Sequence, residues 1–276
     1  MALSASRRFG LAAVLAGVGF LVAYAGLILT ETGQRLENMA LRGARQQFDE
    51  LRAESLAELH QISMLGFALA IGLVMLVALL RRKPRLALMA ALIMGVSVVI
   101  AEVAKRLLGR PDLADAPLNW LHNSFPSGHV TVAVAIGIGA IIVAPYALRW
   151  LATIGAAFYA SAISMDVATA GWHRLSGVIG ATLLVIAVAC LGLYLLTRLG
   201  RVVEFETRRL VGALVATLVL GVRAIGFGGS GSGFGFGRLR PLPSEPTASV
   251  ELLADASTSV TAVGVVALGF LACLWL

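Results

Sequence analysis

The sequence predicts an all-α membrane protein, a polytopic bundle of about eight transmembrane helices. Of its 276 residues, 59% are hydrophobic and 13% are charged, whereas a soluble domain carries roughly 25% charged residues. The apolar residues form runs long enough to cross about 30 Å of hydrocarbon, with short polar segments between them. Helices are the expected form of these runs, because a helix satisfies its own backbone hydrogen bonds within lipid.

The charged residues carry information about topology. The net charge is +7 and the isoelectric point is near 10.2, but the basic residues lie between apolar runs and do not gather on one face. This pattern favours a membrane topology signal over nucleic-acid binding, so no nucleic-acid partner is expected. The two cysteines, Cys190 and Cys273, both lie inside apolar runs, which predicts neither a disulfide framework nor a metal site.

The chain divides into a core and an extension. Residues 1–200 are predicted to form a six-helix core, with spans at 9–29, 62–80, 86–104, 127–144, 151–167 and 175–196. Within the core, the charged segment 31–59 predicts an amphipathic helix outside the bilayer. Residues 201–276 form a C-terminal extension with two further spans, 210–225 and 257–276. These are joined by a Gly-, Ser- and Pro-rich stretch, 227–246, typical of a linker.

The loops predict an orientation. Segments 81–85 and 198–209 are the densest short basic clusters and are expected to be cytoplasmic by the positive-inside rule. The connection 105–125 and the turn around His173 then face outward. The prediction is a multi-pass protein of the plasma (inner) membrane whose site faces the extracytoplasmic side.

The stretch Pro126-Ser127-Gly128-His129 is the strongest candidate for a site. Proline suits the entrance of a helix and serine can cap it. The first free N–H groups of a helix attract an anion, and His129 would stand beside it as a proton donor. An open alternative is that these residues only start a helix and that His129 lies at the membrane interface.

Two other outward segments carry cations and imidazole. Lys105 and Arg110 follow one span, and His173 and Arg174 precede another. Hydrolysis of a phosphate ester needs cations around the phosphoryl oxygens, a nucleophile and an acid for the leaving group. One histidine can be the nucleophile and the other the acid. No Asp/Glu cage for Mg²⁺ is evident, which favours a metal-free, cofactor-free mechanism.

In order and placement, these three segments resemble the motifs of the type-2 phosphatidic acid phosphatase superfamily, which comprises integral-membrane lipid phosphatases. That family has Lys…Arg-Pro, then Pro-Ser-Gly-His, then Ser-Arg followed by His and Asp. The resemblance covers roughly residues 86–196. It implies that His173 is the nucleophile, forming a phosphohistidine, and that His129 is the general acid. It also implies phosphoryl binding by Lys105, Arg110, Ser127 and Gly128.

The third motif departs from the family pattern. Val167 stands where the family has Arg, and Asp166 replaces the preceding Ser. Gly177 stands where the family has the Asp that orients the nucleophilic imidazole. Arg174 is a candidate replacement for the lost cation, and Asp166 is a candidate orienting carboxylate. If the enzyme lacks only that carboxylate, Gly177→Asp is expected to raise a weak turnover.

The first motif departs as well, because Lys105 and Arg110 lie closer together than the family's pair. Two functions therefore stay open. The first is a phosphatase acting on a polyprenyl or glycerolipid phosphate or pyrophosphate, which the retained His129 and His173 favour. The second is an impaired relative that binds anionic lipid or serves as a partner membrane protein, which Val167 and Gly177 favour. A transporter is a weaker third reading, because its polar residues should lie near the midplane. The oligomeric state is open.

Overall fold

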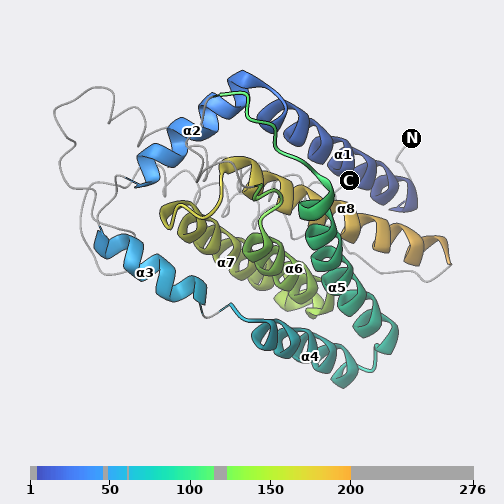
Figure 1. Cartoon of the computed structure of the whole chain (residues 1–276). Helices are drawn as coiled ribbons and strands as arrows, with labels where there is room; N and C mark the ends of the chain where they lie inside the picture. Colours follow the sequence, from blue (N-terminus) through green and yellow to red (C-terminus); the bar gives the residue numbers. More distant parts are fainter. Residues whose placement is uncertain (1–4, 46–48, 61, 115–122, 200–276) are drawn as a thin grey trace.

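The structure is a computed structural model that describes residues 5–45, 49–60, 62–114 and 123–199, and its regular elements in these ranges are all helical. Figure 1 shows their arrangement. In chain order they are α1 (Ala5–Ile28), α2 (Glu31–Arg45), α3 (Asp49–His60), α4 (Met64–Leu80), α5 (Pro84–Leu107), α6 (Gly128–Val143), the short 3-10 helix η2 (Tyr146–Leu148), α7 (Arg149–Thr169) and α8 (Leu175–Arg198). The predicted all-α class is confirmed for the described ranges. The predicted spans 210–225 and 257–276, and the stretch 227–246, lie outside them.

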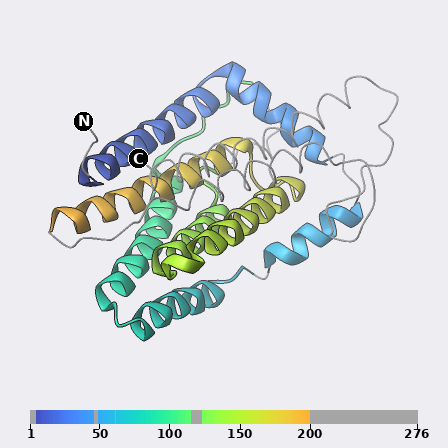
Figure 2. The same cartoon turned by 180° about the vertical axis from the view of Figure 1, so that it is seen from behind.

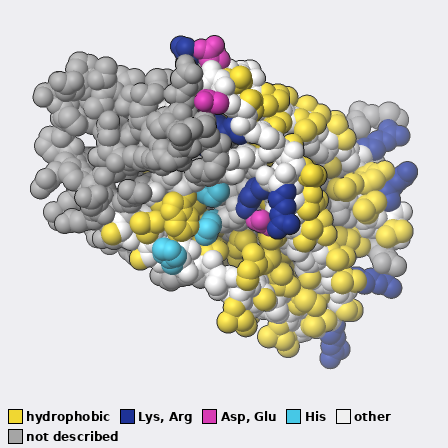
Figure 3. Space-filling model, in the orientation of Figure 1, with side chains coloured by type: hydrophobic (Ala, Val, Ile, Leu, Met, Phe, Trp, Pro, Cys, Tyr) yellow, Lys and Arg dark blue, Asp and Glu magenta, His cyan; other side chains and the backbone are white. Residues whose placement is uncertain are grey.

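In the part of the chain that the structure describes, four helical segments are long and apolar enough to cross a membrane: Ser6–Ile28, Pro84–Leu107, Tyr146–Ala168 and Leu175–Arg198. Helices α4 and α6 are apolar but shorter. Large apolar side chains are exposed along α1, α4 and α5, as the yellow surface in Figure 3 shows. Such a surface is compatible with lipid contact. The count of eight spans and the orientation stay predictions.

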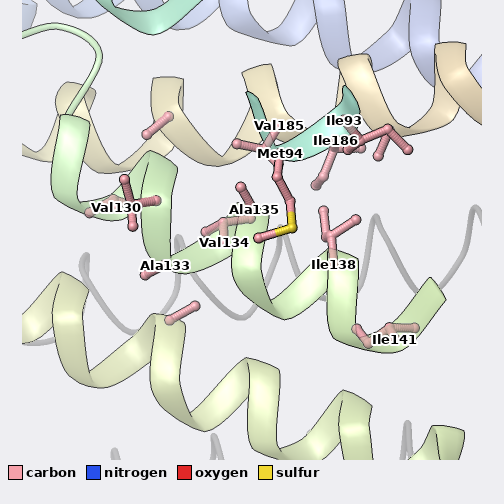
Figure 4. Close-up of a cluster of buried hydrophobic side chains, with 14 of the residues drawn as sticks. Ile93, Met94, Val130, Ala133, Val134, Ala135, Ile138, Ile141, Val185 and Ile186 are labelled. Carbon is pink, nitrogen blue, oxygen red and sulfur yellow. The ribbon is translucent and has the colours of Figure 1, made fainter. Parts of the chain in front are cut away.

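Helix α6 is the centre of the bundle and packs against α4, α5, α7 and α8. Most of its side chains are buried. Two glycines let its neighbours come close: a Cβ at Gly137 would lie 2.7 Å from the Cβ of Ala156, and a Cβ at Gly139 would lie 2.7 Å from the Sδ of Met94. Figure 4 shows Met94 of α5 reaching α6 beside Ile138. Helix α6 is therefore held in a fixed place by close packing on several sides.

The helix ends that carry the candidate site lie together. Helix α5 rises by about 30 Å between Pro84, at the α4–α5 hairpin, and Lys105, near its other end. Figures 1 and 2 both show α2 and α3 away from this hairpin, at the end of the bundle where α7 stops and α8 begins. The basic loop 81–85 and the candidate site thus occupy opposite ends of the bundle.

The predicted amphipathic segment 31–59 needs a correction. It forms two helices, α2 and α3, and the buried face of α2 is largely polar: Gln34, Glu37 and Asn38 are each at most 2% exposed, whereas Leu36 is exposed. Gln34 explains part of this pattern, because its amide nitrogen donates to the carbonyl oxygens of Ile28 (2.7 Å) and Pro111 (2.6 Å). The helix docks on backbone groups of its neighbours, which a hydrophobic pattern does not reveal.

Gly180→Ala is expected to destabilise the fold by about 1–3 kcal/mol, the usual cost of overpacking a core. Phe125 is 1% exposed and packs against the rings of Phe20 and Tyr24. A Cβ at Gly180 would lie 2.1 Å from a ring carbon of Phe125. The measurement is thermal unfolding of the purified protein in detergent. Gly155→Ala is the matched control, since nothing lies within 4 Å of its Cβ position; equal melting temperatures would contradict the packing described.

Candidate functional site

Ser127 caps α6 as predicted. Its hydroxyl oxygen accepts a hydrogen bond from the backbone N–H of Val130 (3.5 Å), and the side chain is fully buried. The backbone N–H of Ser127 donates to the carbonyl oxygen of Gly177 in α8 (3.0 Å). This bond joins the second and third motif segments directly. Phosphoryl binding by Ser127 stays a prediction, and its hydroxyl and N–H are already engaged within the protein.

Lys105 reaches the start of α6. A Cβ at Gly128 would lie 2.9 Å from the Nζ of Lys105, so the ammonium group rests against the glycine backbone. The same Nζ donates to the Oε1 of Glu102 at 2.5 Å, one turn earlier on α5. The first and second motif segments therefore meet, and only a glycine leaves room for the ammonium group there. Glu102 offsets part of the positive charge.

His173 is oriented by a backbone carbonyl. Its Nδ1 lies 3.0 Å from the carbonyl oxygen of Ser124. Because a carbonyl only accepts hydrogen bonds, Nδ1 carries the proton in this arrangement, and the lone pair is on Nε2. An imidazole held in this tautomer is suited to nucleophilic attack.

Asp166, the carboxylate considered from the sequence as the group that orients His173, faces a different element. It interacts electrostatically with Ser55 and Glu58 of α3. The backbone carbonyl oxygen of Ser124 thus occupies the acceptor position at Nδ1. The physical reason is that Asp166 lies within α7, on the side that packs against α3.

His129 belongs to an aromatic group at the same end of the bundle. The ring of Trp172 lies 5.3 Å from His129 and 5.6 Å from His60, measured between centroids. His129 also interacts electrostatically with Lys105 and His60. Figure 3 shows the histidine side chains gathered on one face, near basic and acidic groups. His60 of α3 is therefore part of the surroundings of the site.

The two arginines of the predicted site are both buried. Arg110 is ion-paired with Glu37 of α2, with 2.8 Å between Nη1 and Oε2. Arg174 is the N-cap residue of α8 and is 4% exposed. Phosphoryl binding by either arginine stays a prediction. For Arg110, a substrate would have to compete with a buried carboxylate that already neutralises the guanidinium.

Three contributors to this arrangement were missed from the sequence: Glu37, Asn123 and the Ser124 carbonyl. Asn123 donates from Nδ2 to the carbonyl oxygen of Leu108 (2.5 Å) and accepts from the N–H of Phe125 (3.1 Å). It thereby fastens the end of α5 to the loop before α6. The sequence does contain a signal for Glu37: Gln34, Glu37 and Asn38 fall on one face of a helix, which indicates a polar contact surface. No sequence signal marks a backbone carbonyl.

Within the described ranges, no three His, Cys, Asp or Glu side chains cluster so that they could hold a metal ion. Comparisons of the chain with protein-family models, with curated proteins and with solved structures found no match.

Proposed function

We propose that this protein is an integral-membrane lipid phosphatase of the type-2 phosphatidic acid phosphatase superfamily. Its substrate is the phosphomonoester or pyrophosphate of a polyprenyl or glycerolipid. The reaction takes place at the extracytoplasmic face of the plasma membrane and passes through a phosphohistidine. Lipid tails meet only apolar surface in such a protein, so the phosphate group is the part of the substrate that the motif residues recognise.

The observation that carries the proposal is the contact between three motif segments far apart in the sequence. Lys105 lies against Gly128. The backbone N–H of Ser127 is hydrogen-bonded to the Gly177 carbonyl, and the His173 ring is hydrogen-bonded to the Ser124 carbonyl. A cation, a capped helix start and an oriented imidazole are the groups that phosphoryl transfer to a nitrogen needs. Their meeting at one end of an apolar bundle supports a substrate with a lipid tail and a phosphate head.

The proposed chemistry has two steps. Nε2 of His173 attacks the phosphorus atom while the bond from phosphorus to the ester oxygen breaks, and that oxygen takes a proton from His129. Water then attacks the phosphohistidine and gives a proton to His129, and the phosphorus–nitrogen bond breaks. Inorganic phosphate leaves, and both imidazoles return to their starting state. The Ser124 carbonyl stabilises the cationic ring of His173 during attack, as the missing carboxylate would.

A second candidate is a catalytically impaired relative that binds anionic lipid or serves as a membrane partner subunit. Its support is the internal pairing of both cations of the first motif, Lys105 with Glu102 and Arg110 with Glu37. Paired cations attract a phosphate dianion less strongly than unpaired ones. The fully buried Val167 in place of an arginine adds to this support.

The test is hydrolysis of a panel of polyprenyl and glycerolipid phosphates and pyrophosphates by the purified protein in detergent. We expect phosphate release from at least one lipid, with a rate unchanged by EDTA, because imidazole nitrogens supply both the nucleophile and the acid. Activity that EDTA abolishes and Mg²⁺ restores would contradict the mechanism. No hydrolysis of any lipid in the panel would favour the impaired relative.

A further inference from the structure

Glu37 is a fully buried carboxylate that reaches the site from a helix outside its motifs. Its side chain has 0% exposure, and that of its partner Arg110 has 4%. Oε2 accepts from the guanidinium of Arg110 at 2.8 Å, and Oε1 accepts from the backbone N–H of Ser176 at 2.9 Å. One carboxylate thus joins three separate elements: α2, the loop after α5 and the first turn of α8.

The contact with Ser176 links Glu37 to the proposed nucleophile. Ser176 lies in the first turn of α8, three residues after His173. Two further contacts hold the same region: the Gly177 carbonyl accepts from the backbone N–H of Ser127, and the Ser124 carbonyl lies at the His173 ring. A negative charge at a helix start is favourable because of the helix dipole. Glu37 therefore places a carboxylate from α2 at the start of α8, a few residues from His173.

We propose that Glu37 is a positioning residue for His173. It fixes the loop of Arg110 and the first turn of α8 relative to each other, and so keeps His173 on the Ser124 carbonyl. The effect on turnover rests on the proposed phosphatase function, whereas the effect on His173 itself does not. Arg110 is then a partner of Glu37 in the protein and not a ligand of the substrate.

Glu37→Gln is the variant of choice, because glutamine keeps the shape and an acceptor for Ser176 but removes the charge that holds Arg110. Glu31→Gln is the matched control: Glu31 lies on the same helix and pairs with Arg35, but both side chains are more than half exposed. Loss of the Glu31–Arg35 pair should change stability little, since exposed ion pairs contribute little to the free energy of folding. Should Glu37→Gln not accumulate, Glu37→Asp keeps the charge but is too short to hold both partners.

The first readout needs no enzymatic activity. Histidine modification by diethyl pyrocarbonate, followed residue by residue with mass spectrometry, reports how accessible each ring is. In Glu37→Gln we expect the His173 rate to rise about tenfold, because a local opening that exposes the ring becomes more frequent. The rate at His60 on α3 should stay as in the wild type. An unchanged His173 rate, or an equal rise at His60, would overturn the proposal in favour of a general structural role.

The second readout is the kinetic one. We expect Glu37→Gln to lower kcat about tenfold with little change in KM, because a misplaced nucleophile slows the chemical step and not substrate binding. A raised KM with unchanged kcat would show that Glu37 acts through substrate binding and would overturn the positioning role. If the wild type hydrolyses no lipid phosphate, the proposed function fails, and the modification rates still decide the role of Glu37.

Discussion

His173→Ala is expected to reduce hydrolysis of every lipid phosphate by about 10⁴-fold or more, because the covalent route is lost with the nucleophile. The Nδ1–H of the ring donates to the Ser124 carbonyl, and water can satisfy this backbone acceptor once the ring is removed. The variant should therefore fold. The measurement is the steady-state rate of phosphate release, with thermal unfolding as the check on folding.

His129→Ala separates the roles of the two imidazoles. A general acid contributes about 10²–10⁴-fold for an alkyl ester, and little for an aryl ester whose leaving group needs no proton. An aryl phosphate should therefore restore much of the rate of the first step, seen as a burst of released aryl alcohol, in His129→Ala and none in His173→Ala. Hydrolysis of the phosphohistidine stays slow in His129→Ala, because that step still lacks its base. Equal restoration in both variants would contradict the assignment of His173 as nucleophile.

Gly177→Asp is expected to lower turnover by about 10²-fold, the cost of misplacing a reacting group. This reverses the expectation from sequence, where the aspartate would restore a lost orienting group. A Cβ at position 177 would lie 3.3 Å from the Ser124 carbonyl oxygen and 3.6 Å from Nδ1 of His173. A carboxylate there would compete with the carbonyl for the same N–H and repel its oxygen. The assay is lipid phosphate hydrolysis by the purified variant.

Gly177→Ala is the control for this prediction, because it adds the same Cβ contact without the charge. We expect it to keep most of the wild-type rate if the carbonyl shifts by a few tenths of an ångström. A faster Gly177→Asp enzyme would mean that the Ser124 carbonyl is not the acceptor that positions His173.

The features that depend on local sequence pattern could be predicted from the sequence. Apolar runs predicted the helices of the described core, and α5 and α8 begin within two residues of the predicted spans 86–104 and 175–196. The capping role of Ser127 followed from its place before an apolar run. The pairing of Glu102 with Lys105 is also a local feature, because residues three apart are neighbours on a helix.

The remaining features depend on contacts between distant segments. Ser124 acts through its backbone carbonyl, which every residue possesses, so its identity gives no hint. Glu37 meets Arg110 and Ser176 only because α2 docks across the bundle end. Asp166 is a candidate for orienting His173 from the sequence if the turn between them folds back, whereas α7 directs it to α3. Long-range polar contacts of this kind have no periodicity from which they could be predicted.

Detection of a phosphorylated histidine tests the central claim most directly. Purified protein is mixed briefly with a lipid phosphate that it hydrolyses, quenched in alkali, in which a phosphorus–nitrogen bond survives, and digested for mass spectrometry. We expect phosphate on His173 in the wild type, more of it in His129→Ala given an aryl phosphate, and none in His173→Ala. Phosphate on another residue, or turnover in the His173→Ala protein at the wild-type rate, would contradict the central claim.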